Sequence, residues 1–145
     1  MSKKLAGGWL FKEEPSCFSY FDLEKAGSTL WSGVKNALAR KHLRSLQLGD
    51  RVLYYHTGKE RAIVGEMRVA TAPTTDPKSD DPKSVVVKVE PVQRWDPPVT
   101  LVQIKADPVF ADWELLRISR LSVMPVTAKQ WQRLEEICRS GGKKD

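Results

Sequence analysis

The chain is poor in the residues and patterns on which several classes of protein depend. Its 145 residues include only two cysteines, Cys17 and Cys138, which lie far apart and form no metal-like pair. A disulfide-stabilised secreted fold is therefore excluded, and a reducing compartment fits. No stretch approaches the roughly eighteen uninterrupted apolar residues of a membrane span, and the charged segment 12–14 comes too early for a secretory signal. We expect a protein that is neither secreted nor membrane-bound, cytoplasmic in a bacterium or nuclear in a eukaryote.

Familiar catalytic and cofactor motifs are also missing. The sequence has no glycine-rich phosphate loop, no paired-histidine metalloprotease helix and no serine elbow. Its two histidines, His42 and His56, have no cysteines nearby and make a poor zinc site. Cys138 falls on the apolar face of the last expected helix, where a thiol most simply serves as a small apolar side chain. We expect no metal, no cofactor and no hydrolase of a familiar type.

What is present is enough apolar residue for one core and an excess of positive charge. Hydrophobic residues make up 41% of the chain, and 24 Lys and Arg against 18 Asp and Glu give a formal net charge of +6. The length suits one domain, for which we expect flexible ends at residues 1–7 and 140–145 and a monomeric state. A basic excess attracts polyanions, so nucleic acid is the first partner to consider, against the alternative of a merely basic protein.

The hydrophobic patterns predict several strands and short helices. Strands are expected at 9–11, 51–56, 61–71, 85–90 and 120–124, an irregular stretch at 29–35 and a proline-rich loop at 73–83. Helices are expected at 20–26, 37–46 and 101–105 and after residue 127, with Ser19, Asn36, Thr100 and Thr127 as their N-terminal caps. The elements do not alternate as βαβ units. We therefore predict an α+β domain with a curled, barrel-like sheet.

Two groups of residues suit nucleic-acid binding. Lys35, Arg40, Lys41 and Arg44 lie on or beside the helix that Asn36 caps, and no acidic residue occurs between positions 35 and 48. They favour phosphate contact, with a solvated helix face as the alternative. Trp31 lies in a stretch without helical or strand periodicity, beside a glycine. A tryptophan there suits stacking on a base, and the alternative is that it covers the core.

Three sequence segments resemble the EVE domain, a PUA-like family. They are WLFKEEP at 9–15, WSGVKNALAR at 31–40 and LGDRVLYYH at 48–56, and the likeness continues to about Trp131. The resemblance implies a PUA-like twisted β-barrel of five to six strands surrounded by short helices. It also implies binding of DNA or RNA with a modified or flipped-out base held in a pocket, as in the related YTH and SRA domains.

The resemblance further implies where that pocket lies. Its expected residues come from the first strand, the stretch around Trp31, the second long strand and the last strand, and they are Lys12, Glu13, Trp31, Val34, Asn36, Tyr55, His56, Arg120 and Ser122. The chain departs from the family pattern at Glu13, where Ser or Thr is usual, and at Lys35, where arginine is usual. Its proline-rich loop lacks the usual tyrosine, and the tryptophan expected just before residues 85–87 is missing.

Two other functions stay open. Some relatives with the ASCH fold use a lysine and a carboxylate to hydrolyse an amide on a base, and Lys12 with Glu14 offers the same groups. Lys12 and Glu13 cannot both point into one cavity without a bulge, because neighbouring residues on a strand face opposite ways. The third possibility is a protein-interaction module with a vestigial pocket. Our leading hypothesis is a non-catalytic reader of a modified nucleobase.

Overall fold

The computed structural model describes residues 6–142. Along the chain, the elements are β1 (Ala6–Glu13), α1 (Tyr20–Ala26), β2 (Thr29–Trp31), α2 (Ala37–Arg44), β3 (Arg51–His56), β4 (Ala62–Thr75), β5 (Val85–Thr100), α3 (Leu101–Lys105), the short 3₁₀ helix η2 (Pro108–Phe110), α4 (Glu114–Arg117), β6 (Val123–Thr127) and α5 (Ala128–Gly142). Of the expected flexible ends, residues 6–7 belong to β1 and 140–142 to α5, and the rest lie outside the described part. Within residues 6–142, no helix is long and apolar enough to cross a membrane.

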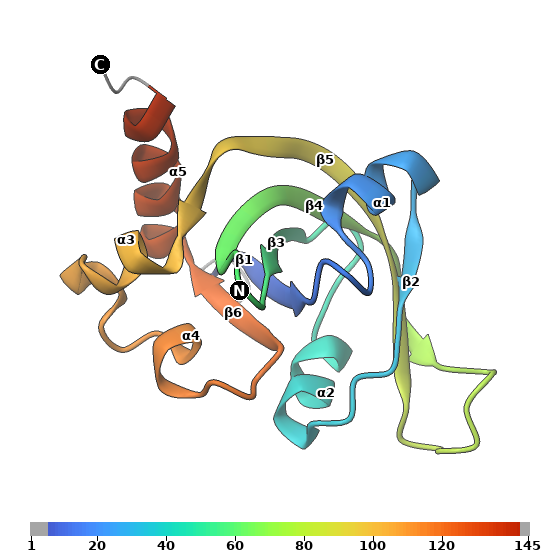
Figure 1. Cartoon of the computed structure of the whole chain (residues 1–145). Coiled ribbons are helices and arrows are strands. Elements are labelled where there is room, and N and C mark those ends of the chain that lie inside the picture. Colours follow the sequence, from blue (N-terminus) through green and yellow to red (C-terminus); the bar gives the residue numbers. More distant parts are fainter. Residues whose placement is uncertain (1–5, 143–145) are drawn as a thin grey trace.

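All six strands form one strongly curved sheet, in the order β2-β5-β4-β3-β1-β6 (Figure 1). β1 runs parallel to β3, and the other neighbouring strands are antiparallel. The α+β prediction and the number of strands are therefore confirmed. The sheet does not close into a barrel: β2 and β6 are its two edges, and α2 packs against β5 and β6 on the open side (Figure 1).

Local capping explains where the predicted helices begin. The Ser19 hydroxyl accepts a hydrogen bond from the Asp22 N–H, and the Asp22 carboxylate accepts one from the Ser19 N–H. Gly27 ends α1 in the left-handed conformation, with φ of 80°. Asn36 caps α2, which ends at Arg44 and not at 46 as expected. The capping boxes at Thr100 and Thr127 also form.

The strand predictions need several corrections. β1 and β5 are longer than the expected 9–11 and 85–90, and β5 continues through Pro91 to Thr100. Residues 29–31, expected to be irregular, form β2 because they pair with Val87–Val89 of β5. The last strand is 123–127 and not 120–124, and Pro125 lies inside it. The strand tolerates this proline because β6 is an edge that pairs only with β1. The loop runs over 76–84, since β4 continues to Thr75.

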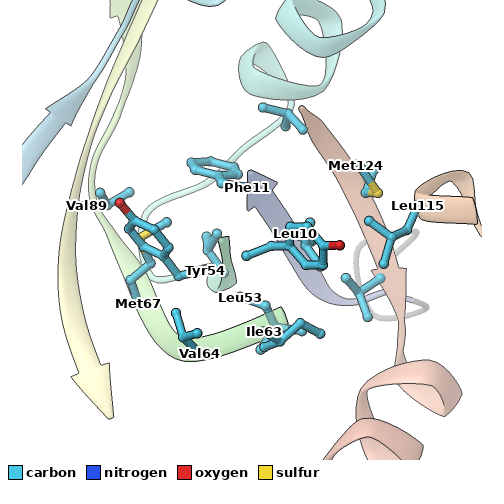
Figure 2. Close-up of a cluster of buried hydrophobic side chains, with 14 of the residues drawn as sticks. Leu10, Phe11, Leu53, Tyr54, Ile63, Val64, Met67, Val89, Leu115 and Met124 are labelled. Carbon is cyan, nitrogen blue, oxygen red and sulfur yellow. The ribbon is translucent and has the colours of Figure 1, made fainter. Parts of the chain in front are cut away.

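The core lies on both faces of the β1–β3 pair. Figure 2 shows Phe11 and Tyr54 on the side toward β4 and β5, and Leu10 with Leu115 and Met124 near β6 and α4. All five side chains are buried. Because β1 and β3 are covered on both faces, the face that a residue of these strands occupies decides which site it can reach.

Candidate functional site

The pleat of β1 and β3 divides the predicted pocket residues between two faces of the sheet. In the parallel register, Phe11 lies beside Tyr54 and Glu13 beside His56, whereas Lys12 lies beside Tyr55. Phe11 and Tyr54 both pack against Trp31. We call this side the Trp31 face. Glu13 and His56 belong to it by alternation, and Lys12 and Tyr55 point the other way.

Trp31 is part of a row of packed rings. Its ring centroid lies 5.1 Å from that of Phe11 and 5.4 Å from that of Tyr54, which in turn contacts Tyr20 at 5.5 Å and His56 at 5.4 Å. The Trp31 residue is only 6% exposed. In this conformation the indole covers the core, which was the alternative interpretation of its sequence position. A base can stack on it only if the neighbouring chain moves.

His56 is held on both ring nitrogens. Nε2 accepts the Tyr20 backbone N–H at 3.1 Å, and Nδ1 lies 2.7 Å from Glu60 Oε1. Because Nε2 accepts a hydrogen bond, Nδ1 carries a ring proton and donates a hydrogen bond to Glu60. His56 is 3% exposed and joins the start of α1 to the β3–β4 turn. These contacts favour a structural role for His56 over the ligand contact that we expected.

Glu13 brings a half-buried carboxyl group to the Trp31 face. Burial raises its pKa, and the nearby Glu14 carboxylate raises it further, against a hydrogen bond from the Glu14 backbone. The Tyr54 hydroxyl donates to the Phe18 carbonyl, and burial together with the charge of Glu13 raises the pKa of Tyr54. A carboxylate in this place accepts hydrogen bonds from the amino group of a ligand more readily than it would in water.

Lys12 turns toward the segment that precedes β6. Its Nζ donates to the Ser119 carbonyl at 2.9 Å, its backbone N–H donates to the Ser122 carbonyl at 2.9 Å, and burial lowers its pKa. Ser122 and the exposed Arg120 were expected in the last strand, but they lie in the segment that precedes it. The structure therefore groups Lys12 with residues 119–122, away from the Trp31 face.

The Lys12–Glu14 pair of the hydrolase hypothesis is not assembled. The Glu14 carboxylate lies over the β3–β4 turn, where Thr57 Oγ1 is 3.5 Å from Oε1 and a Cβ added to Gly58 would approach Oε1 to 2.7 Å. Lys12 Nζ is instead held by Ser119. Within residues 6–142, no hydrogen bond or ion pair connects Lys12 to Glu14.

The segment between β2 and α2 presents fewer free groups than its sequence suggests. Asn36 Oδ1 accepts the Ala39 N–H at 2.9 Å, so only the Asn36 amide nitrogen is left for a ligand. Val34 packs on the core, and its carbonyl accepts from Arg40 Nε at 2.7 Å. Asn36 and Lys35 are exposed. This segment is the solvent side of the Trp31 site.

The predicted phosphate-binding residues fall into two groups. Arg40 Nη2 binds the Asp81 carboxylate at 2.9 Å, and Arg44 Nη2 donates to the Lys83 carbonyl at 2.6 Å. These two arginines hold the 76–84 loop, a contact that spans about forty positions and that the sequence does not reveal. The side chains of Lys35 and Lys41 are exposed and form no hydrogen bond or ion pair with any described residue. They are the cations that remain free for phosphate.

Comparison with known proteins identifies the family. The EVE domain model matches residues 8–137. The chain belongs to the EVE domain family. The resemblance seen in the sequence is thereby confirmed, and so is the PUA-like α+β fold, as an open curved sheet.

Three relatives of this EVE domain have informative structures. A protein from Rhodopseudomonas palustris is 37% identical, with a TM-score of 0.84 and 94% of each chain covered. Human thymocyte nuclear protein 1 is 29% identical over 163 residues, 89% of this chain and 72% of that protein. Its crystal structure in complex with 5-methylcytosine-containing DNA has a TM-score of 0.82 at 27% identity, covering 94% and 98%. An ASCH protein from Zymomonas mobilis, at 12% identity and a TM-score of 0.60 over 89% and 94%, shares the fold alone.

The EVE domain also contains a cavity that sequence reasoning missed. It has a volume of about 210 Å³ and lies between the start of α1, the β3–β4 turn and the later part of β5. We call it the Trp95 cavity, and its principal lining residues are Tyr20, Phe21, Glu60, Arg94, Trp95 and Asp96. Of the predicted pocket residues, His56 lines this cavity and Trp31 does not. The one sequence feature that could have indicated it is the bulky Arg-Trp-Asp-Pro-Pro run inside a strand, but the other walls come from distant segments.

Proposed function

We propose that this EVE domain binds nucleic acid without catalysis and holds a modified base on the Trp31 face. The observation that carries the proposal is the complex of human thymocyte nuclear protein 1 with 5-methylcytosine-containing DNA, since that protein shares the fold over nearly the whole chain. The basic net charge of this chain and its two free lysines beside the Trp31 site support the same conclusion. The expected compartment and the monomeric state stay predictions.

Each proposed contact follows from a group already described. The indole of Trp31 would stack on the base, and the Glu13 carboxylate would accept a hydrogen bond from an exocyclic amino group such as that of cytosine. The Asn36 amide nitrogen would donate to a base acceptor. Lys35 and Lys41 would neutralise the flanking phosphates. Lys12, Tyr55, Arg120 and Ser122 have no part in this arrangement, and His56 supports it only through Tyr54.

Base entry requires the Trp31 site to open. The segment most able to move is 32–36, which connects the three-residue strand β2 to α2 and is mostly exposed. Opening is opposed by the packing of Trp31 on Phe11 and Tyr54 and by the Arg40 contact with the Val34 carbonyl. A base that replaces the ring contacts of Trp31 compensates for part of that loss.

The test is a titration of fluorescent oligonucleotides, single-stranded and duplex, with either 5-methylcytosine or cytosine at one position. We expect the methylated strand to bind more tightly and both affinities to fall as salt rises. Trp31→Ala removes a buried aromatic side chain, which typically costs about 3–5 kcal/mol, so Trp31→Phe and Glu13→Gln are the better variants. Trp31→Phe should reduce the preference for the methylated strand, and Glu13→Gln should weaken binding to both strands because both bases carry the amino group. Both variants should keep the fold by circular dichroism.

Charge removal provides the matched control. Lys35→Ala and Lys41→Ala should weaken binding to both strands and flatten the salt dependence, whereas Lys105→Ala, an exposed lysine on α3, should do neither. Equal affinity for the two strands, unchanged by Glu13→Gln, would refute base reading. Turnover of a modified nucleoside that Lys12→Ala abolishes would favour the hydrolase instead, and capture of proteins with no nucleic acid would favour the interaction module.

A further inference from the structure

The Trp95 cavity has one flat wall whose orientation is fixed. The Arg94 guanidinium carbon lies 4.1 Å from the centroid of the Phe21 ring, and Arg94 Nη2 binds Glu24 Oε1 at 2.6 Å. The Phe21 residue is 53% exposed, and the Arg94 side chain is 48% exposed although it is held at two points. A guanidinium plane fixed in this way, with much of its surface still open, can stack on a planar ligand.

The two donor groups of Tyr20, on the floor of the cavity, are already used. The Tyr20 hydroxyl donates to the Glu66 carbonyl at 2.6 Å, and the Tyr20 N–H donates to His56 Nε2. Burial and the charge of Glu24 raise the pKa of Tyr20 to about 12, so its hydroxyl keeps its proton. His56 Nδ1 donates its hydrogen bond to Glu60. A ligand here meets aromatic surface below and must find its polar partners at the rim.

The rim provides acceptors and an excess of negative charge. The Asp96 side chain forms no hydrogen bond or ion pair with the described residues, and Glu60 uses only Oε1 for His56. Arg94, the one cation among the principal lining residues, is already paired with Glu24. Two carboxylates, Glu60 and Asp96, are therefore left without a cation of their own. Such a rim attracts amino groups and repels phosphate.

We infer that the Trp95 cavity binds one planar heterocycle that carries an exocyclic amino group and no phosphate, in the class of adenine, cytosine and their nucleosides. The ring stacks between Arg94 and the aromatic surface, and its amino group donates to Asp96 or Glu60. The volume of about 210 Å³ suits a single ring system, since pockets for drug-sized ligands occupy about 300–1,000 Å³. The inference is independent of the proposed function, because Trp31 does not line this cavity.

The test is a titration of the whole chain, observed by ¹H–¹⁵N NMR, with adenosine, inosine and adenosine 5′-monophosphate. Adenosine should produce saturable shifts of the Trp95 indole and Arg94 signals. Inosine lacks the amino group, and losing a hydrogen bond to a charged acceptor should weaken its binding about tenfold. The monophosphate should also bind more weakly, and more so at low salt, because the carboxylate rim repels it.

Variants locate the binding and separate it from base reading. Asp96→Asn and Phe21→Ala should each weaken adenosine binding, while Asp112→Asn, at an exposed position outside the cavity, should not. Trp31→Phe should leave adenosine binding unchanged even where it alters oligonucleotide binding. The inference is overturned if adenosine gives no saturable shift, if inosine or the monophosphate binds as tightly, or if the shifts move to Trp31 instead of Trp95.

Discussion

Gly65 should be the position in β4 that is most sensitive to a single added methyl group. A Cβ built on Gly65 would lie 2.5 Å from both Cε1 and Cζ of the Tyr20 ring. Relief to an ordinary carbon–carbon contact requires the ring to move by about 1 Å. The ring has little freedom to do so, because its hydroxyl donates to the Glu66 carbonyl and its edge packs against Tyr54.

The expected cost of Gly65→Ala follows from these contacts. Overpacking a core typically costs about 1–3 kcal/mol, and weakening the Tyr20 hydrogen bond adds about 1 kcal/mol, against a gain of about 0.5–1 kcal/mol from replacing glycine in a strand. We therefore expect a loss of roughly 1–3 kcal/mol in the free energy of unfolding, measured by urea titration with tryptophan fluorescence.

A double-mutant cycle decides whether the Tyr20 ring is the cause. In a Tyr20→Ala background the obstructing ring is gone, so Gly65→Ala should become neutral or slightly stabilising. The reasoning is refuted if Gly65→Ala costs less than about 0.5 kcal/mol alone, or if its cost is the same in both backgrounds. Adenosine binding to the Trp95 cavity is a second readout, since Tyr20 is part of its floor.

Three further predictions concern the Trp31 site and its surroundings. Burial raises the pKa of Glu13, so the folded state binds this proton more tightly than the unfolded state does. The ionised carboxylate therefore lowers the free energy of unfolding as pH rises above the ordinary glutamate pKa of about 4.3. Glu13→Gln should stabilise the protein at pH 7 and have little effect at pH 4, measured by urea titration. Asn36→Ala removes the cap of α2 and should cost about 1 kcal/mol by thermal unfolding, with Asn36→Asp nearly neutral. Asp81→Asn frees Arg40 from its internal anion and should tighten oligonucleotide binding a few-fold at low salt, an effect that disappears in an Arg40→Ala background.

The sequence predicts best the features that depend on neighbours within four positions. The caps at Ser19, Asn36 and Thr127 are local hydrogen bonds between a side chain and the next turn, and each forms as expected. Alternation along a strand is equally local. It already indicated that Lys12 and Glu13 face opposite ways, and the family resemblance, which placed both in one pocket, did not override it.

Features that depend on distant partners could not be predicted from the sequence. Residues 29–31 have no strand periodicity, and they form β2 only because Val87–Val89 of β5 lies beside them. The tolerance of Pro125 depends on β6 being an edge. The basic run on α2 suggested arginines that are free to bind an anion. Arg40 is instead paired with Asp81, which lies 41 positions further along the chain. The burial of Trp31 has the same origin, since its ring neighbours come from β1 and β3.

The proposed binding of a base at Trp31 would depend on the open side of the sheet. Phe11 and Tyr54, which pack on the indole, lie on β1 and β3. Each of these strands is paired on both sides, so moving them would break two strand pairings. Trp31 itself ends a three-residue edge strand, and α2 beyond it is held to the 76–84 loop by exposed arginine contacts. Local opening free energies are lowest where few buried contacts must break. Movement of β2 and the segment 32–36 is therefore the least costly route to exposing the indole. The same movement would loosen the contact of Arg40 Nε with the Val34 carbonyl, while the contact of Arg40 Nη2 with Asp81 would remain.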